Sequence, residues 1–288
     1  MSGPLILADL PWLLYRAHFA MPSSITDGSG APAGALLGTA NALLAAGEAC
    51  RPRAILACTG AEEAEHRVRA FPPYHAHRPP MPDELRAQWE RAPALLQALG
   101  IAVPDGGALE ADDLMGSYAQ VESQAGGEAL IFTADRDLFQ AVDEHVGVLE
   151  IKGRDPARVI DAAEVRKRSG VPPALIPDLI ALRGDPSDGI PGAPGIGAKT
   201  AADLLGRHGS LEAAIAASLR ERPRVGSALR EHADQLRMFK EIATLVQVDV
   251  ERPADRALDA AGGARAARTL GLERLATRLE RMARAASN

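Results

Sequence analysis

The chain is poor in aromatic residues and has no long apolar run. Aromatic residues make up only 3% of its 288 residues, so its core must be built mainly from Leu, Ala, Val and Ile. No stretch of about 18 apolar residues occurs, which argues against a transmembrane helix and a membrane partner. No basic segment precedes the first apolar residues, and Asp9 interrupts them, so we expect no signal peptide.

Cysteine is also scarce. Cys50 and Cys58 form neither a C-x-x-C pair nor a zinc-binding spacing, and the seven histidines show no metal-binding spacing. Reduced thiols in a cytoplasmic protein are the simplest interpretation. We therefore expect a cytoplasmic location and no zinc site.

The net charge of −6 at first argues against a polyanionic partner. Eight acidic residues, however, fall into the clusters described below, and setting those eight negative charges aside takes the rest of the chain from −6 to +2. Between Gly206 and Asn288, 15 basic residues outnumber 11 acidic ones. The charge distribution therefore permits a nucleic-acid partner without requiring one.

Short apolar runs alternate with helical patterns over the first part of the chain. The runs predict strands at Leu5–Ala8, Ala54–Cys58, Ala129–Phe132 and Val146–Ile151, and the patterns predict helices at Ala35–Ala49, Glu84–Leu99 and Asp112–Ser123. This alternation predicts an α/β fold with a mostly parallel sheet flanked by helices. After about Glu164 the strand pattern fades and the sequence becomes helical, so we place a domain boundary near residue 170, between 1–170 and 171–288.

Acidic residues gather at the predicted strand ends and helix starts. They are Asp9; Glu110, Asp112 and Asp113; Asp135 and Asp137; and Asp185 and Asp188. Each group alone could be a helix cap or a turn. Because sites in open α/β sheets form at the carboxyl ends of strands, we expect the groups to converge.

Clustered carboxylates repel one another and raise each other's pKa values. Hard divalent cations relieve this repulsion, and Mg²⁺ prefers oxygen ligands. Two such ions can activate a water molecule and stabilise both the attacking and the leaving oxygen of a phosphodiester. The pattern therefore predicts a metal site suited to phosphodiester hydrolysis.

The glycine-rich run Gly192–Thr200 is not a nucleotide-binding loop. Ala198 separates Gly197 from Lys199, which breaks the P-loop motif, and no third glycine or preceding strand supports a dinucleotide fingerprint. A hairpin whose glycine N–H groups face a DNA phosphate at a helix N-terminus fits better. A plain interhelical turn is the alternative.

Residues 75–91 contain His77, Arg78, Arg86 and Arg91 together with Trp89. One interpretation is a solvated amphipathic helix with Trp89 in the core. A cationic groove for a single strand is the other, and one tryptophan is weak support for it.

Taken in order, these motifs resemble the 5′→3′ exonuclease and flap endonuclease family, in the bacterial form that is fused to DNA polymerase I or stands alone. The resemblance covers nearly the whole chain. The matching segments are Asp9 with Leu14–Ala17, Tyr74–Pro82, Glu110–Asp113, Thr133–Leu138, Gly184–Gly192 and Pro194–Ala201.

The resemblance implies a PIN-like 5′→3′ exonuclease catalytic domain at residues 1–170. A small helical DNA-binding domain with a helix–hairpin–helix would follow at residues 171–288. It also implies a metal-dependent 5′→3′ exonuclease and structure-specific flap endonuclease, acting on DNA in replication or repair. The partners would be DNA with a 5′ flap or free 5′ end and an RNA primer, and the protein would be a monomer. A PIN-type enzyme that cuts RNA is disfavoured because the helical DNA-binding part is present.

By position in the motifs, the resemblance implies three overlapping sets of site residues. The metal-site carboxylates would be Asp9, Glu110, Asp112, Asp113, Asp135, Asp137, Asp185 and Asp188. The catalytic residues would be Arg78, His75, Asp112 and Asp113. The DNA-binding residues would be Arg16, Tyr74, Arg78, Gly195, Gly197, Lys199 and Thr200. The cofactors would be two or more Mg²⁺ ions, replaceable by Mn²⁺, with K⁺ at the hairpin.

The sequence departs from the family pattern at two places. The family usually carries an aspartate directly after its second strand, whereas this chain has Thr59-Gly60-Ala61 and no carboxylate before Glu62. The lysine of the Tyr-Lys-x-x-Arg motif is His75 here, and histidine is mostly neutral near pH 7. A branched-DNA-binding relative with weak or lost catalysis is therefore the alternative function.

Overall fold

A five-stranded sheet forms the centre of the computed structural model, which describes residues 3–151 and 157–286. The strands are β1 (Leu5–Asp9), β2 (Ala54–Cys58), β3 (Ala129–Phe132), β4 (Val146–Glu150) and β5 (Arg158–Ile160). They lie in the order β2-β1-β3-β4-β5, with β1 to β4 mutually parallel and β5 antiparallel to β4. The predicted mostly parallel sheet is confirmed. The short edge strand β5 was not predicted, because only one of its three residues is buried.

Helices connect the parallel strands, as the alternating pattern predicted. In the first 150 residues they are α1 (Leu10–Ala20), α2 (Gly34–Cys50), α3 (Glu65–Ala70), α4 (Asp83–Ala98), α5 (Ala111–Gln124) and the 3-10 turn η1 (Asp137–Ala141). The three predicted helices match α2, α4 and α5 to within one residue at each end. The capping box of Glu110 and Asp113 fixes where α5 begins.

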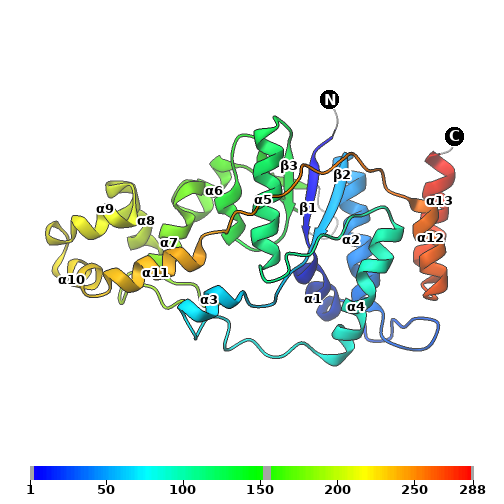
Figure 1. The fold of residues 1–288 in the computed structure, drawn as a ribbon, viewed down its shortest axis with the longest axis horizontal. Helices are drawn as coiled ribbons and strands as arrows, with labels where there is room; N and C mark the ends of the chain where they lie inside the picture. The colour runs from blue at the N-terminus through cyan, green and yellow to red at the C-terminus, as the bar shows by residue number, and fades with distance from the viewer. Residues whose placement is uncertain (1–2, 152–156, 287–288) are drawn as a thin grey trace.

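The described residues after 170 form only helices, short 3-10 turns and loops. From residue 162 onward the elements are α6 (Ala162–Ser169), η2 (Pro173–Leu175), α7 (Ile176–Arg183), α8 (Ala198–His208), α9 (Leu211–Ala216), η3 (Ser218–Arg220), α10 (Pro223–Glu231), α11 (Ala233–Ala243), α12 (Ala260–Thr269) and α13 (Glu273–Ala286). Helices α8 to α10 lie at one end of an elongated molecule, and α12 and α13 lie at the other (Figure 1). The predicted helical second part is confirmed.

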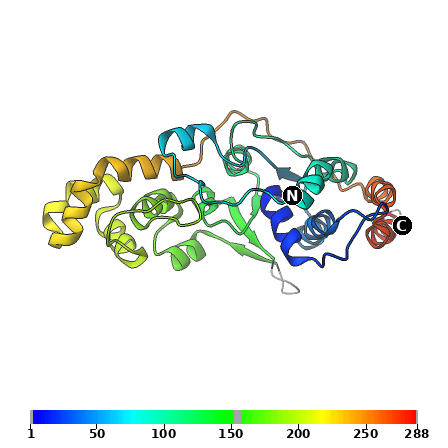
Figure 2. The ribbon, with the colours of Figure 1, turned by 90° about the horizontal axis from the view of Figure 1, so that it is seen from below.

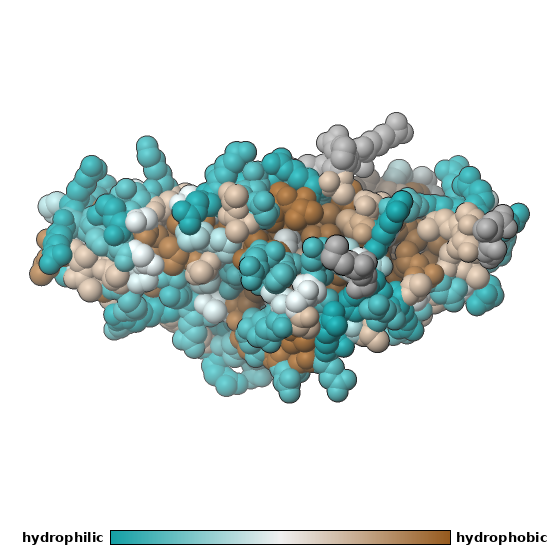
Figure 3. Space-filling view, turned by 90° about the horizontal axis from the view of Figure 1, so that it is seen from above, coloured by the Kyte–Doolittle hydropathy of each residue, from teal (hydrophilic) through white to brown (hydrophobic). Residues whose placement is uncertain are grey.

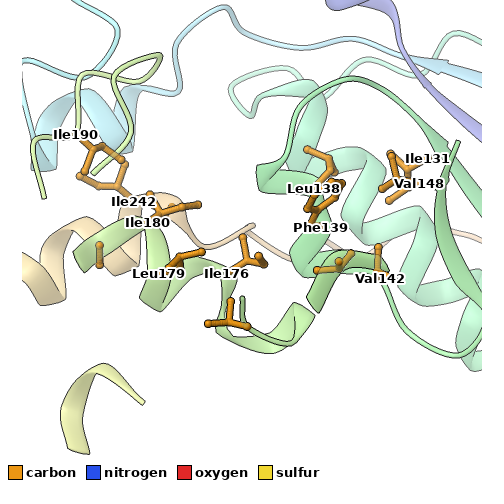
Figure 4. Packing of buried hydrophobic residues seen from close by; sticks show 14 of the residues in the cluster. Ile131, Leu138, Phe139, Val142, Val148, Ile176, Leu179, Ile180, Ile190 and Ile242 are labelled. Carbon is orange, nitrogen blue, oxygen red and sulfur yellow. The ribbon is translucent and has the colours of Figure 1, made fainter. Parts of the chain in front are cut away.

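The two faces of the sheet support two separate cores. Alternate strand residues such as Ile6, Ile55 and Phe132 pack with α1, α2, α4, α12 and α13. Their neighbours Leu7 and Ile131 pack on the other face with α5, α7 and α11. Figure 4 shows Leu138 and Phe139 of η1 close to Ile131 and Val148, with Ile176, Leu179 and Ile180 farther along the same core. The sheet is therefore buried on both sides, as parallel sheets usually are.

The last two helices do not pack with α8 to α10. An extended segment, residues 244–259, carries the chain from α11 back past α5 to α12 (Figures 1 and 2). Arg252 and the buried Arg53 both bind Glu122 at the end of α5 and hold this segment in place. Ala264, Ala267 and Leu275 then join the core of α2 and α4. Residues 260–286 therefore pack on the core of the first part of the chain, and the division into domains 1–170 and 171–288 stays a prediction.

The carboxyl ends of the parallel strands point toward α1 and α3, at the bottom of Figure 1. Figure 2 views the molecule from that side. Figure 3 shows the opposite face, where hydrophobic residues are scattered among hydrophilic ones. This mixture is ordinary for a protein surface. Among the described residues, no helix is long and apolar enough to cross a bilayer.

Candidate active site

Asp9 stands at the carboxyl end of the central strand β1. Its Oδ1 accepts a hydrogen bond from the Trp12 backbone N–H (2.9 Å) and so caps α1, while Oδ2 accepts one from the Thr133 hydroxyl (2.7 Å). Thr133 directly follows β3, the neighbouring strand. Asp9 is therefore held between two adjacent strand ends, and its side chain is almost fully buried.

The residues after β3 form a turn that fixes the next two carboxylates. The backbone N–H of Asp135 donates to the Thr133 hydroxyl (3.1 Å), and that of Asp137 donates to Asp135 Oδ1 (2.8 Å). Asp137 then opens the turn η1, whose Leu138 and Phe139 are buried. This packing holds Asp135 and Asp137 beside Asp9.

Glu110 and Asp112 come from the start of α5. Glu110 accepts hydrogen bonds from the Ala64 N–H (2.8 Å) at Oε1 and from the Tyr74 hydroxyl (3.0 Å) at Oε2. Asp112, two residues later, is half-buried and faces Asp9 and Asp135 closely enough for their charges to act on it. The start of α5 thus supplies the second pair of carboxylates.

Asp185 and Asp188 belong to the loop that follows α7. Asp185 forms an antiparallel bridge with Ile190 and accepts hydrogen bonds from the N–H and hydroxyl of Ser187. Asp188 Oδ1 lies 3.1 Å from His75 Nε2 and 3.0 Å from Arg78 Nη2. The helical part of the chain therefore places Asp185 and Asp188 beside the carboxyl ends of the strands.

Seven of the eight predicted carboxylates line one cavity of about 1110 Å³. They are Asp9, Glu110, Asp112, Asp135, Asp137, Asp185 and Asp188. Tyr74, His75 and Arg78 line the same cavity. The structure thus brings together acidic residues that are up to 179 positions apart in the chain.

Asp113 does not join this set. It is completely buried, and Arg67 donates to both of its oxygens, at 2.8 Å and 2.5 Å. It also accepts a hydrogen bond from the Val246 N–H (2.8 Å). With both oxygens occupied by protein donors, Asp113 has the environment of a structural carboxylate rather than that of a metal ligand.

Sequence reasoning missed Arg67, which is only 3% exposed. Its guanidinium binds Asp113, lies 3.0 Å from Glu110 Oε2 and donates to the Ile242 carbonyl of α11 (3.0 Å). The sequence did contain a pattern that could have revealed it. Residues 64, 67 and 71 recur at helical intervals, and Ala64 and Phe71 on either side of Arg67 in this pattern are apolar. That spacing indicates an inward position for Arg67, whereas Arg69 faces solvent.

His75 occupies an unusual backbone conformation. Its φ of +56° lies in the left-handed region, and its ring is buried and stacks on Tyr74 with centroids 3.8 Å apart. Nδ1 lies 3.3 Å from the Glu62 carbonyl and Nε2 meets Asp188. Such backbone strain is often found at functional sites. His75 therefore links the segment before α4 to the acidic loop after α7.

The remaining predicted DNA-binding residues lie outside the cavity. Arg16 is exposed on α1, with its guanidinium carbon 5.3 Å from the centroid of the Trp12 ring. Gly195 adopts φ +77° in the turn between α7 and α8, and Arg224 lies so close that a Cβ on Gly195 would contact its guanidinium. Gly197 caps α8, and Lys199 is exposed in its first turn. Thr200 follows and is half-buried.

The cavity disfavours negative charge at several carboxylates. Burial raises the pKa of Asp9 to about 6, and the charge of Asp135 adds to the shift. The pKa values of Asp112 and Asp137 are well above the usual range because of burial and then of neighbouring carboxylates, with Asp135 the largest contributor to each. At Asp188 burial opposes ionisation, but the hydrogen bond and charge of His75 and the charge of Arg78 lower the pKa. Cations in the cavity would therefore be strongly favoured.

This electrostatic strain predicts that the metal-free protein becomes less stable as the pH rises from about 5 to above 6. A carboxyl group with a raised folded-state pKa stabilises the fold fully below its unfolded pKa, and the stabilisation is lost as the pH passes through the folded value. Asp9 defines the window from 3.8 to about 6, and Asp112 and Asp137 extend it upward. Groups with lowered pKa values, such as Glu122, give stability that is gained as the pH rises through their ordinary value of 4.5, so the net decline is expected above about pH 5. Thermal unfolding in a chelator across this range measures the slope, and a stability that rises with pH would contradict the expectation.

The donor set fits hard divalent cations. The seven predicted carboxylates in the cavity, with Glu62 and Glu63 beside them, offer oxygen ligands, which Mg²⁺ and Mn²⁺ prefer. Among the described residues, no three His, Cys, Asp or Glu side chains stand close enough together to hold one ion as they are placed.

Comparisons with known proteins agree with the fold. The family profile of the 5′-3′ exonuclease N-terminal, resolvase-like domain matches residues 4–170, and that of the 5′-3′ exonuclease C-terminal SAM fold matches residues 171–261. The T5 D15 protein, co-crystallised with metal ions, superposes with a TM-score of 0.70 at 15% identity, covering 98% of both chains. The catalytic core of Rad2 in complex with DNA substrate gives 0.64 at 13% identity, covering 96% of this chain and 93% of that one.

Curated relatives are more similar in sequence. A 5′-3′ exonuclease of Mycobacterium tuberculosis is 34% identical, with 98% of both chains covered. One of Streptomyces coelicolor is 39% identical over 72% of each chain. The DNA polymerase I of Pseudomonas aeruginosa is 36% identical over 87% of this chain and 28% of the polymerase. The resemblance noted in the sequence is thereby confirmed, and the chain belongs to the 5′-3′ exonuclease family, a family of phosphodiester hydrolases.

Proposed function

We propose that the chain cleaves DNA near free 5′ ends and at 5′ flaps, and that its acidic cavity binds two or more Mg²⁺ ions for this reaction. The observation that carries the proposal is the convergence of seven carboxylates from four chain regions on one cavity. A bacteriophage T5 flap endonuclease with a similar fold has been solved in a complex with DNA and metal ions, which supports a DNA-cleaving function for this chain.

The proposed ligands are Asp9, Glu110, Asp112, Asp135, Asp137, Asp185 and Asp188. Bound ions would supply an activated water and stabilise the charge on the attacking and leaving oxygens. Mg²⁺ keeps several of its waters when bound, which suits carboxylates spread around a wide cavity. Mn²⁺ has similar ligand preferences and should substitute. We leave Asp113 out of this set because Arg67 already occupies both of its oxygens.

Cationic residues at the cavity would position the scissile phosphate. Arg78 contacts Asp188, but its side chain remains 46% exposed, so it is free to turn toward an incoming phosphate. His75 holds Asp188 from the buried side, and Tyr74 orients Glu110 through its hydroxyl. In this proposal Arg78 and His75 are catalytic, and Tyr74, which stacks on His75, is a positioning residue for Glu110.

We further propose that the turn between α7 and α8 binds a backbone phosphate of the duplex. The N-terminal N–H groups of α8 have no side-chain cap at Gly197, and Lys199 and Thr200 lie in the first turn. Such a contact is independent of sequence and sensitive to salt. Lys199→Ala should reduce the slope of log affinity against log salt by about one. An unchanged slope would contradict this role, and equal DNA affinity in Na⁺ and K⁺ would argue against K⁺ at the turn.

A labelled 5′-flap substrate, a matched substrate with a recessed 5′ end and an RNA-primed version of the latter test the function. We expect products from the first two with Mg²⁺ or Mn²⁺ and none with a chelator. Comparison with the RNA-primed substrate shows whether the site accepts RNA 5′ ends. If no metal produces cleavage of any of these substrates, the proposed activity is wrong.

Two observations favour the alternative of a branched-DNA binder with weak catalysis. His75 stands where the family pattern has a lysine, and no carboxylate directly follows β2, where the first acidic residue is Glu62 at the edge of the cavity. Restoring an aspartate at Gly60 is not possible without moving backbone, because a Cβ there would lie 2.2 Å from the Leu109 carbonyl oxygen. Gly60→Asp would therefore disturb the local fold and is not a usable test of activity. His75→Lys is the usable test, and binding without cleavage in both proteins would favour the binder.

A further inference from the structure

Gln140 is a half-buried amide in η1, and both polar atoms of its side chain are bound. Its Nε2 donates to the Asp137 carbonyl (2.9 Å) and to the Ala243 carbonyl (2.9 Å). Its Oε1 accepts a hydrogen bond from the Leu245 N–H (3.0 Å). A primary amide has two N–H donors and one carbonyl, so these contacts use both donors and the carbonyl. One side chain therefore joins the turn after β3 to the end of α11.

The chain leaves α11 through residues 242–246, which we call the α11 exit. The last carbonyls of a helix have no partners within the helix, and here side chains of other elements supply them. Gln140 binds the carbonyl of the last helical residue, and Arg67 of α3 binds the carbonyl before it. Asp113 of α5 accepts a hydrogen bond from the Val246 N–H (2.8 Å). The α11 exit is therefore held by η1, α3 and α5 together.

Helix α11 is also fixed to α7. Lys240 Nζ lies 2.9 Å from an oxygen of Asp178, a buried carboxylate of α7. The loop that follows α7 carries Asp185 and Asp188, whose charges reach Asp137. Through the α11 exit, the protein thus connects the proposed metal ligand of η1 with the two proposed ligands of the acidic loop.

Two features make this connection rigid. The backbone of Asp137 is held at both ends, because its N–H donates to Asp135 Oδ1 (2.8 Å) and its carbonyl accepts from Gln140. Neither contact uses the Asp137 carboxylate, which stays available to a cation. The α11 exit also lies tightly against α5, since a Cβ on Gly116 would lie only 2.8 Å from the side chain of Leu245. A side chain that only capped α11 would need no contact with a residue of the metal site.

We propose that Gln140 is a positioning residue that fixes Asp137 relative to the carboxylates of the loop after α7, and that this fixed spacing favours Mg²⁺ over larger cations. The inference rests on the proposed function and names what determines the metal preference of the same cavity. Mg²⁺ demands near-ideal octahedral geometry at about 2.0–2.1 Å, whereas Ca²⁺ accepts irregular geometry at about 2.3–2.6 Å. Carboxylates on a loosened turn can still surround Ca²⁺, but they meet the requirement of Mg²⁺ poorly.

Gln140→Met tests the proposal, because methionine keeps the length of the side chain and removes both donors and the acceptor. Calorimetric titrations with Mg²⁺ and with Ca²⁺ are made without DNA, at a temperature where circular dichroism shows the variant fully folded. Partners that orient a metal ligand contribute a factor of about 10 to 100 in metal affinity. We expect the Mg²⁺ affinity to fall about tenfold and the Ca²⁺ affinity to fall much less. A loss of stability alone would not change the ratio of the two affinities.

Gln140→Glu separates position from charge and serves as the second variant. Glutamate keeps the size and the acceptor, loses both donors and adds a negative charge beside the turn of Asp137. If charge alone governed binding, the Mg²⁺ affinity would rise, whereas positioning requires a fall, as in Gln140→Met. Gln120→Met is the matched control, since Gln120 is exposed on α5 and does not line the cavity. It should bind both ions as the unchanged protein does.

An unchanged Mg²⁺ affinity in Gln140→Met, equal losses for Mg²⁺ and Ca²⁺, or a higher Mg²⁺ affinity in Gln140→Glu would overturn the inference. The titrations contain no DNA, so they are independent of cleavage. An unchanged affinity ratio in Gln140→Met, with flap cleavage by the unchanged protein, would remove the role of Gln140 and keep the nuclease. A ratio that depends on Gln140 in a protein that cleaves no DNA substrate would keep the role of Gln140 and remove the nuclease.

Discussion

Asp112→Asn should lower the rate of flap cleavage about a thousandfold or more and should also stabilise the metal-free protein. Asp112 lies among Asp135, Asp9 and Glu110, whose charges together with burial raise its pKa. Asparagine keeps the size of the side chain but removes the charge that binds metal. Charge stabilisation by a bound ion contributes several kcal/mol to such a transition state, and about 1.4 kcal/mol corresponds to a tenfold change in rate.

The stability part of this prediction separates a metal ligand from a structural residue. Removing one of several repelling carboxylates relieves the electrostatic strain, so the unfolding temperature in a chelator should rise. Mg²⁺ should raise the unfolding temperature of the unchanged protein and raise that of the variant less. The measurements are flap cleavage and thermal unfolding, each with and without Mg²⁺.

Asp234→Asn is a suitable control, because Asp234 also lies in the first turn of a helix, α11, but is almost fully exposed and does not line the cavity. It should cleave normally and unfold at nearly the same temperature. Normal cleavage by Asp112→Asn would remove Asp112 from the metal site. A lower unfolding temperature in the chelator would show that its role is structural.

The sequence was sufficient to predict β1 to β4, the helices α2, α4 and α5, and the convergence of the acidic clusters. Four apolar runs gave β1 to β4, and the rule that sites form at the carboxyl ends of parallel strands brought together residues as distant as Asp9 and Asp188. That rule acts through topology, so it needs only the identity and order of the strands. It does not need the orientation of any side chain.

The position of Asp113 apart from the cavity was not predicted, because it depends on side-chain orientation. Adjacent residues of a helix point about 100° apart, since 3.6 residues complete a turn. Asp112 and Asp113 therefore point in different directions, and only Asp112 lines the cavity. Which of the two faces it depends on the rotation of α5, and buried Leu114 and Met115 together with Arg67 fix that rotation. None of these tertiary contacts is visible in the local sequence.

The packing position of α12 and α13 could not be predicted from the sequence for a similar reason. Their helical pattern was visible, but it does not say which core they cover. That is decided by residues 244–259, which run past α5 with Arg252 bound to Glu122. Ion pairs between residues 130 positions apart leave no local pattern.

Arg67→Lys should weaken both the fold and the metal site, because Arg67 joins the two. Its guanidinium binds Asp113, contacts Glu110 and reaches the Ile242 carbonyl at the end of α11. Lysine is a single point charge and cannot reproduce this forked geometry. Breaking such a buried pair costs about 3–5 kcal/mol when it leaves a carboxylate without its partner.

The effect on metal binding should exceed what lost stability explains. Partners that orient a metal ligand typically contribute a factor of about 10 to 100 in metal affinity. Arg67→Lys should therefore need about tenfold more Mg²⁺ for half-maximal cleavage, even at a temperature where it is fully folded. Calorimetric titration with Mg²⁺ checks the same affinity without cleavage.

Arg69→Lys provides the comparison within the same helix. Arg69 lies two residues away in α3, is 75% exposed and pairs only with Glu65 at the surface, so this change should leave stability and Mg²⁺ affinity nearly unchanged. If Arg67→Lys lowers the unfolding temperature but keeps its Mg²⁺ affinity, Arg67 supports the fold alone. If the two effects occur together, one buried guanidinium both joins α11 to α5 and orients Glu110. The departure of Asp113 from the predicted ligand set is then explained by its role as the partner of Arg67.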